Sequence, residues 1–303
     1  MHQEALLTKL VYEPDPLRCI LDLLVSRLDP LVDVDDISAS YDRIEEEIRD
    51  FEQWLNNIWG QSFYRLLVGG KEDWALPKAF KAADERDGNI LICDGLSLRE
   101  LLVLKRAFQG RVNYMAGKAP VPTTTDTVVR KVFNSVGLKD AITGSKLYWG
   151  RQWTGQIIED ISDPPRLGGQ RGLMFLTHYP DAPLHQARSH RTTQIQDISK
   201  VIKEVVTLVE ELSRNVPLIV TGDHGYIYLG TNPNKYMWLP YRRQERFGGE
   251  YGENGIEVED IKVATGRYHA PIISGSTTFI VHGGISLTES LVPIIVIEAG
   301  ATA

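Results

Sequence analysis

Cysteine is scarce in this chain: among 303 residues only Cys19 and Cys93 occur, without a Cys-x-x-Cys spacing. Two distant cysteines do not make a disulfide framework, so the sequence favours a reducing compartment. No apolar run approaches the roughly 20 residues needed to cross a bilayer. The first residues also lack the cationic start and long apolar core of a secretion signal. We therefore expect a cytoplasmic protein that does not engage a membrane.

An excess of positive charge is also missing. The chain has 33 Lys and Arg against 40 Asp and Glu, a formal net charge of −7. Non-specific nucleic-acid binding needs a basic face, so nucleic acid is expected only as a substrate. The local basic clusters at 188–191 and 242–246 are interpreted as solvated or carboxylate-paired surface. A hydrophobic content of 43% is ordinary for a globular protein and allows one large α/β domain with an appendage.

Residues 1–87 have the pattern of a helical N-terminal extension. A helix is predicted over Leu17–Leu28, after a Pro-Asp-Pro segment. A second helix is predicted by apolar residues spaced three and four apart, with acids between them. These residues are Ile44, Ile48, Phe51, Leu55 and Ile58. No catalytic constellation occurs here, so we expect a region that packs on the main domain or docks a protein partner.

Residues 88–303 alternate between strand-like and helix-like segments. The predicted strands are Ile90–Cys93, Leu173–Leu176, Leu218–Val220, Thr277–Val281 and Leu291–Ile297. The predicted helices cover about 97–108, 125–136 and 195–212. Strands separated by long helices indicate right-handed crossovers and a largely parallel sheet, so we expect a three-layer α/β/α domain. A long inserted segment at about 226–270 lacks periodicity, and such loops often form lids or substrate walls.

Four strand-like segments end in residues that can bind metal. They supply Asp94, then Asp181 with His185, then Asp223-His224, and finally His282. Because ligands gather beyond the carboxyl ends of parallel strands, these side chains are expected to converge. Mixed Asp and His sets suit zinc, with manganese as an alternative, and six ligands with one hydroxyl could serve two ions. Singly, each residue could instead belong to an ordinary turn.

A candidate nucleophile precedes one of the predicted helices, in the segment Pro122-Thr123-Thr124-Thr125-Asp126. A threonine hydroxyl at a helix N-terminus lies at the positive end of the helix dipole, where free amides can also bind a phosphate. A metal would lower the pKa of that hydroxyl and make it an attacking alkoxide. The alternative is that the threonines only cap the helix.

The order of these residues resembles the alkaline phosphatase superfamily. Three segments are more similar still to the PglZ domain, which occurs in bacterial phage-defence systems and in some response regulators. They are Ile92-Cys93-Asp94-Gly95-Leu96, Thr221-Gly222-Asp223-His224-Gly225-Tyr226, and His282-Gly283-Gly284 with the Ile285–Glu289 and Leu291-Val292-Pro293 residues that follow. The resemblance covers roughly residues 88–300, and the His-Gly-Gly segment is its most specific part.

The resemblance implies a role for each matching residue. One metal ion would be held by Asp94, Asp223, His224 and the Thr125 oxygen. The other would be held by Asp181, His185 and His282. Thr125 would attack phosphorus in line, and water would then release the phospho-threonine.

The sequence departs from the family patterns at a few positions. PglZ domains often carry an acid where His185 stands, and His178 matches a family histidine of unassigned role. Arg130, one turn after Thr125, could contact a phosphate or be an ordinary surface residue. Sulfatases share the fold, but they need a Cys-x-Pro-x-Arg segment that this sequence lacks.

The sequence thus predicts a metal-dependent phosphoester hydrolase. The resemblance implies a two-zinc phosphodiesterase that acts on a nucleotide or oligonucleotide, within a bacterial phage-defence system. One alternative is a scaffold or sensor module that binds metal and a phosphorylated ligand without turnover. A weaker alternative is a monoesterase or mutase.

Overall fold

The computed structural model describes residues 12–165, 167–184, 197–230, 232–270 and 280–300. Its centre is a seven-stranded sheet in the order β2-β13-β6-β1-β5-β4-β3. The strands are β1 Asn89–Asp94, β2 Val112–Lys118, β3 Gly144–Tyr148, β4 Arg151–Ile158, β5 Leu173–Pro180, β6 Leu218–Gly222 and β13 Leu291–Ile297. β6, β1, β5 and β4 run parallel, whereas β13 and β3 are antiparallel to their neighbours. The predicted α/β class with a mostly parallel sheet is confirmed.

Helices pack on both faces of this sheet. The helices of the described residues are α2 Pro16–Leu28, α3 Ile37–Trp59, α4 Gln61–Val68, α5 Ala75–Glu85, α6 Leu98–Ala107, α7 Thr125–Lys131, α8 Leu138–Ile142, α9 Asp181–Leu184, α10 Ile198–Leu212, α11 Pro233–Tyr236 and α12 Leu287–Ser290. Successive side chains of a strand alternate between faces. Leu91 and Cys93 accordingly share a core with α2, α3, α6 and α10, while Ile90 and Ile92 share another with α5, α7 and α8. Within the described residues, no helix is long and apolar enough to span a membrane.

Side-chain caps fix where several helices begin. The Asp36 carboxylate accepts a hydrogen bond from the Ala39 amide at the start of α3. Ser97 and Glu100 form a capping box at the start of α6, directly after β1. The predicted helices over 17–28 and through the α3 stripe are confirmed, except that Ile58 lies 42% exposed at the end of the stripe.

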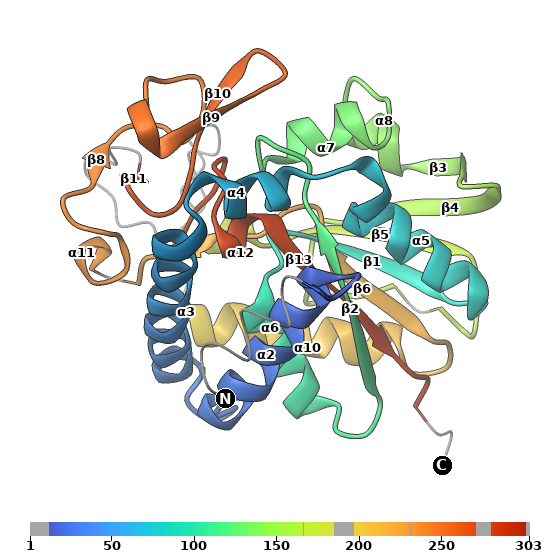
Figure 1. The fold of residues 1–303 in the computed structure, drawn as a ribbon. Coiled ribbons are helices and arrows are strands. Elements are labelled where there is room, and N and C mark those ends of the chain that lie inside the picture. Colours follow the sequence, from blue (N-terminus) through green and yellow to red (C-terminus); the bar gives the residue numbers. More distant parts are fainter. Residues whose placement is uncertain (1–11, 166, 185–196, 231, 271–279, 301–303) are drawn as a thin grey trace.

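The N-terminal helices share the main core. Buried residues of α2 and α3, including Leu21, Ile44 and Leu55, belong to the same cluster as Leu91 of β1 and Val220 of β6. Figure 1 shows these helices beside the sheet, with α3 and α4 next to the inserted segment. The N-terminal helices therefore link the sheet to the inserted segment.

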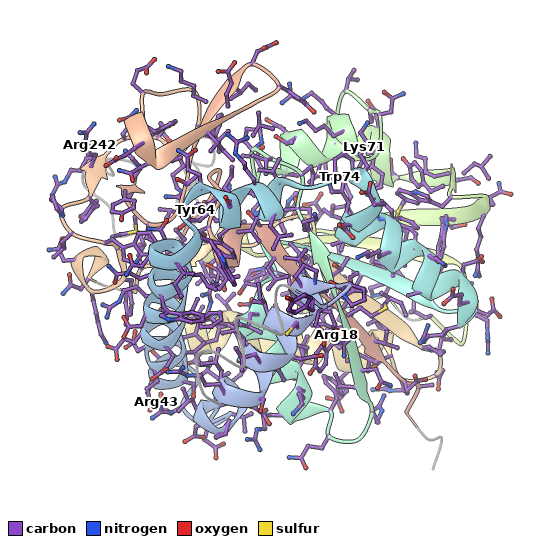
Figure 2. All side chains as sticks on the ribbon, in the orientation of Figure 1. Arg18, Arg43, Tyr64, Lys71, Trp74 and Arg242 are labelled. Carbon is purple, nitrogen blue, oxygen red and sulfur yellow. The ribbon has the colours of Figure 1, made fainter. Side chains whose placement is uncertain are left out.

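The inserted segment consists of short elements rather than a structureless loop. They are β7 Ile227–Tyr228, α11, β8 Arg242–Arg243, β9 Gly255–Val258, β10 Ile261–Ala264 and β11 His269–Ala270. A buried ion-pair network joins this segment to α3, because Arg267 pairs with both Glu45 and Glu52. Figure 2 places Arg242 at the periphery of the molecule, on β8. One side of the segment is thus anchored and the other faces solvent.

Two sequence predictions are wrong in detail. The helix predicted from Thr125 to about Val136 ends at Lys131, because Phe133 turns into the core and Asn134 adopts a left-handed backbone with φ of 50°. The strand predicted over Thr277–Val281 is described only at its end. That part, β12 Ile280–Val281, pairs antiparallel with β7 in a small ribbon outside the central sheet.

Candidate metal centre

Three neighbouring parallel strands deliver acidic residues to one edge of the sheet. Asp94 is the last residue of β1, Asp181 directly follows β5, and Asp223 directly follows β6. β1 lies between the other two strands, with Cys93 in register with Gly222. The convergence predicted for the carboxyl ends of these strands therefore occurs for three carboxylates.

Thr125 reaches this edge from the first position of α7, whose N-cap is Thr124. The Thr125 hydroxyl donates a hydrogen bond of 3.2 Å to Oδ1 of Asp94. The Asp223 carboxylate lies nearby, and the hydroxyl acts to lower the pKa of that acid. The hydroxyl is therefore held between two carboxylates, at the positive end of a short helix.

Asp94, Asp223 and His224 present ligand atoms within 4.8 Å of one another. His224 Nε2 lies 3.5 Å from Asp94 Oδ1 and 3.9 Å from Asp223 Oδ1. With zinc–ligand bonds of about 2.0–2.2 Å, two ligands on one tetrahedral ion lie about 3.3 Å apart. The spacing of these atoms is close to that value, so the three side chains fit a shared cation.

Two polar atoms of this group are buried without a partner among the described residues: Asp223 Oδ2 and His224 Nε2. The other oxygen of Asp223 accepts hydrogen bonds from the Gly95 and His224 amides, at 3.2 and 2.8 Å. His224 Nδ1 lies 3.0 Å from the Gly225 carbonyl oxygen and donates to it, which leaves Nε2 as the ring atom that faces Asp94. Orphaned buried ligand atoms are costly, and a bound cation would satisfy both.

The electrostatics of the group also favour a cation. Burial raises the pKa of Asp94, and the nearby Asp181 carboxylate raises it further. Burial likewise raises the pKa of Asp223, and Asp94 adds to this rise. Burial acts to lower the pKa of His224, but the carboxylates of Asp223, Asp94 and Asp181 raise it to about 9. Negative charge is thus in excess here, and a divalent ion would restore ionised carboxylates and a neutral imidazole.

A second pair of candidate ligands lies beside the first group. His282 Nε2 lies 3.5 Å from Asp181 Oδ1, again close to the spacing on one tetrahedral ion. The His282 ring stacks on the His224 ring with centroids 4.3 Å apart, so the two groups adjoin. His185, the third ligand expected for this ion, lies outside the described residues. The structure therefore brings together six of the seven predicted site residues.

Thr123 is a site residue that the sequence reasoning did not assign. Its carbonyl oxygen lies 3.1 Å from His282 Nδ1 and accepts its proton, which leaves Nε2 facing Asp181. Its hydroxyl accepts from the Gly283 amide and donates to the Gly284 carbonyl, both at 3.0 Å. Thr123 therefore joins the nucleophile segment to the His-Gly-Gly segment. It could have been noticed as the first of three consecutive threonines.

His178 also belongs to the site. It lies on β5, which extends to Pro180 rather than ending at the predicted Leu176, and its Nδ1 atom is 3.6 Å from Asp94 Oδ2. This contact with Asp94 raises the pKa of His178. Arg130, by contrast, is exposed and donates within α7 to the Asp126 carbonyl oxygen. His178 thus lies at the candidate metal centre, whereas Arg130 lies on the surface of α7.

Comparison with known proteins leaves the family open. No protein-family model matches the sequence, and no curated protein matches it significantly. The argument for function therefore rests on the chemistry of the centre.

Proposed function

We propose that this protein is a metal-dependent phosphoester hydrolase, a two-zinc phosphodiesterase with Thr125 as its nucleophile. The observation that carries the proposal is the Thr125 hydroxyl, held 3.2 Å from Asp94 beside a buried and orphaned His224 Nε2. A hydroxyl at a helix N-terminus within a ring of candidate ligands is the arrangement that phosphoryl transfer to a side chain requires. Zinc, when bound, would supply a positive charge that favours the threonine alkoxide and stabilises negative charge on the phosphate oxygens.

The protein's own groups would perform the remaining tasks. Asp94 accepts a hydrogen bond from the Thr125 hydroxyl and would orient it, with the Asp223 carboxylate nearby. Asp94, Asp223, His224 and Thr125 would hold one ion, and Asp181, His185 and His282 the other. The stacking of the His224 and His282 rings supports the proposal that two neighbouring ions would share one substrate phosphate.

We further assign the chain to the PglZ domain family, with a three-layer alkaline phosphatase-like domain at 88–303 and an extension at 1–87. The support is the match of motif order to strand ends, with helices on both faces of the sheet. A nucleotide or oligonucleotide ester in a bacterial phage-defence system is the context that this family suggests.

Metal content and activity together test the proposal. Elemental analysis should find two zinc ions per chain, falling to one or none in Asp223→Ala, which removes a ligand without touching Asp181 or His282. Thr125→Ala should abolish hydrolysis of bis(4-nitrophenyl) phosphate, whereas Thr125→Ser, which keeps a hydroxyl, should retain part of it. Finding manganese instead of zinc would change the identity of the proposed ion but leave the proposed metal centre in place.

The outcomes separate the alternatives. Full metal loading with no hydrolysis of any phosphoester, and binding of phosphate, would favour the non-catalytic binding module. A preference for 4-nitrophenyl phosphate over the diester would favour a monoesterase. Metal content unchanged in Asp223→Ala would refute the centre itself.

A further inference from the structure

Phe247 lies at the edge of the candidate metal centre, although it belongs to the inserted segment. A Cβ atom placed on Gly283 would lie 2.9 Å from Cδ1 of Phe247 and 3.8 Å from Cγ2 of Thr124. Gly283 directly follows His282, and Thr124 directly precedes Thr125. Because Gly283 has φ of 103° and no side chain, the Phe247 ring packs against its backbone. The ring is therefore one residue away from a candidate ligand.

The backbone at Phe247 is held in place by its neighbours. Phe247 forms a bridge with Val263 of β10, and the Ala264 amide donates to the Arg246 carbonyl oxygen at 2.8 Å. The preceding side chain, Arg246, is fully buried and forms a two-pronged ion pair with Glu289, at 2.7 and 2.5 Å. The buried Arg246 side chain thus stands next to an exposed Phe247 on this anchored segment.

The exposure of Phe247 is unusual for a ring anchored so firmly. It is 42% exposed, while Arg246 beside it is 1% exposed. The hydrogen-bonded main chain already fixes the position of the ring. Stacking a planar group on it therefore costs the protein little further conformational entropy. The ring matches the size of one planar ring system.

We propose that Phe247 is the platform on which a nucleobase of the substrate stacks while the phosphate is held beside Thr125. This inference rests on the proposed phosphodiesterase function and specifies its substrate class as nucleotide esters. Stacking on an aromatic side chain tolerates every base, because each base has a π-face. Phe247 therefore distinguishes nucleotides from sugar phosphates, without selecting one base.

Two ligands that differ only by the base test this proposal: AMP and ribose 5-phosphate, titrated calorimetrically into zinc-loaded protein. The wild type should bind AMP about tenfold more tightly or better, within the range of base–aromatic stacking. Phe247→Ala should weaken AMP binding about tenfold and change ribose 5-phosphate binding less than twofold, while Phe247→Trp should keep the preference. Leu239→Ala, which truncates another exposed apolar residue of the inserted segment, is the matched control.

The results distinguish this inference from the function on which it rests. Equal affinity of the wild type for both ligands, or equal losses of both in Phe247→Ala, would overturn the platform and leave the phosphate site standing. Binding of neither ligand by the zinc-loaded wild type would overturn both proposals. A preference for the base-containing ligand that depends on Phe247, without hydrolysis of any ester, would support the stacking platform. It would refute only the proposed hydrolase activity.

Discussion

At the scale of single residues, Thr123 shows how a small side chain can hold the candidate metal centre together. Its hydroxyl satisfies two backbone groups of the Gly283-Gly284 turn, and its carbonyl oxygen fixes the proton of His282 on Nδ1. Thr123 is completely buried, so water cannot replace these bonds. The orientation of His282 therefore depends on a residue 159 positions away.

Thr123→Val keeps the shape of the side chain but removes its hydroxyl. We expect a loss of about 2 kcal/mol in the free energy of unfolding, since the Gly283 amide is left buried and unsatisfied. Zinc binding at the His282 site should weaken by up to about tenfold, because the variant keeps the carbonyl oxygen that orients His282 but releases the adjacent Gly283-Gly284 backbone. Urea unfolding and a competitive zinc titration measure the two effects. Thr123→Ser, which keeps the hydroxyl, should restore most of both; equal zinc affinity in all three proteins would contradict the role.

The candidate ligands at the strand ends could be predicted from the sequence, because their positions follow local sequence patterns. Apolar runs that stop at Asp94 and Asp223-His224 mark the carboxyl ends of parallel strands, and those ends meet at one edge. His178 was not readable in this way, since the apolar pattern of β5 fades at Leu176 while the strand continues to Pro180. Its contact with Asp94 depends on the irregular register between β1 and β5.

At the scale of elements, α3 connects the inserted segment to the sheet through buried charge. Arg267 of the inserted segment pairs with Glu45 and Glu52 of α3, and Glu45 also pairs with Arg99 of α6. All four side chains are fully buried. From the sequence, the acids of α3 alternate with its apolar stripe and look solvent-facing. Their burial could not be foreseen because the two arginines come from distant segments.

Arg267→Met should be strongly destabilising, because it leaves Glu45 and Glu52 buried with less positive charge. Removing one partner of a buried pair typically costs about 3–5 kcal/mol. We expect a loss of that size in urea unfolding, with faster proteolysis within the inserted segment. Arg242→Met, which changes an exposed arginine of the same segment, should shift stability by at most about 0.5 kcal/mol. Comparable stability of the two variants would show that the network does not anchor the segment.

Element ends and pairings were the least predictable part of the fold. Helix α7 ends early because Phe133 packs with Phe80 and Tyr148, a tertiary contact that helix periodicity cannot reveal. β12 pairs with β7 rather than with the central sheet, and two-residue ribbons of this kind leave no periodic pattern. His282 therefore reaches the centre from a ribbon, although a sheet strand was expected to deliver it.

At the scale of the whole molecule, the clustered carboxylates of the candidate centre oppose folding. Asp94, Asp181 and Asp223 gather where burial and mutual repulsion raise the pKa values of Asp94 and Asp223. A ligand that binds only the folded state stabilises it by mass action, by about 2.7 kcal/mol at a concentration 100 times Kd. For a domain of this size, each kcal/mol shifts Tm by about 2 °C.

Zinc at 100 times its Kd should therefore raise Tm by about 5 °C relative to chelated protein, as followed by calorimetry. The rise should be largely lost in Asp223→Ala and reduced less in Thr125→Ala, which loses one assigned ligand oxygen but retains the Asp94, Asp223 and His224 group. Magnesium at the same concentration, which prefers an all-oxygen octahedral shell, should produce a much smaller shift. A Tm that is identical with zinc and with chelator would count against a metal centre at this position.

The position of β13 has a consequence for how the chain is made. Although it is the last strand among the described residues, it lies inside the sheet, hydrogen-bonded to β2 on one side and β6 on the other. Translation proceeds from the N-terminus, so the ribosome must reach β13 before β2 can gain its neighbour in the sheet. A message cut short just before Leu291 would still encode every candidate ligand, yet its product would lack the strand that joins β2 to β6.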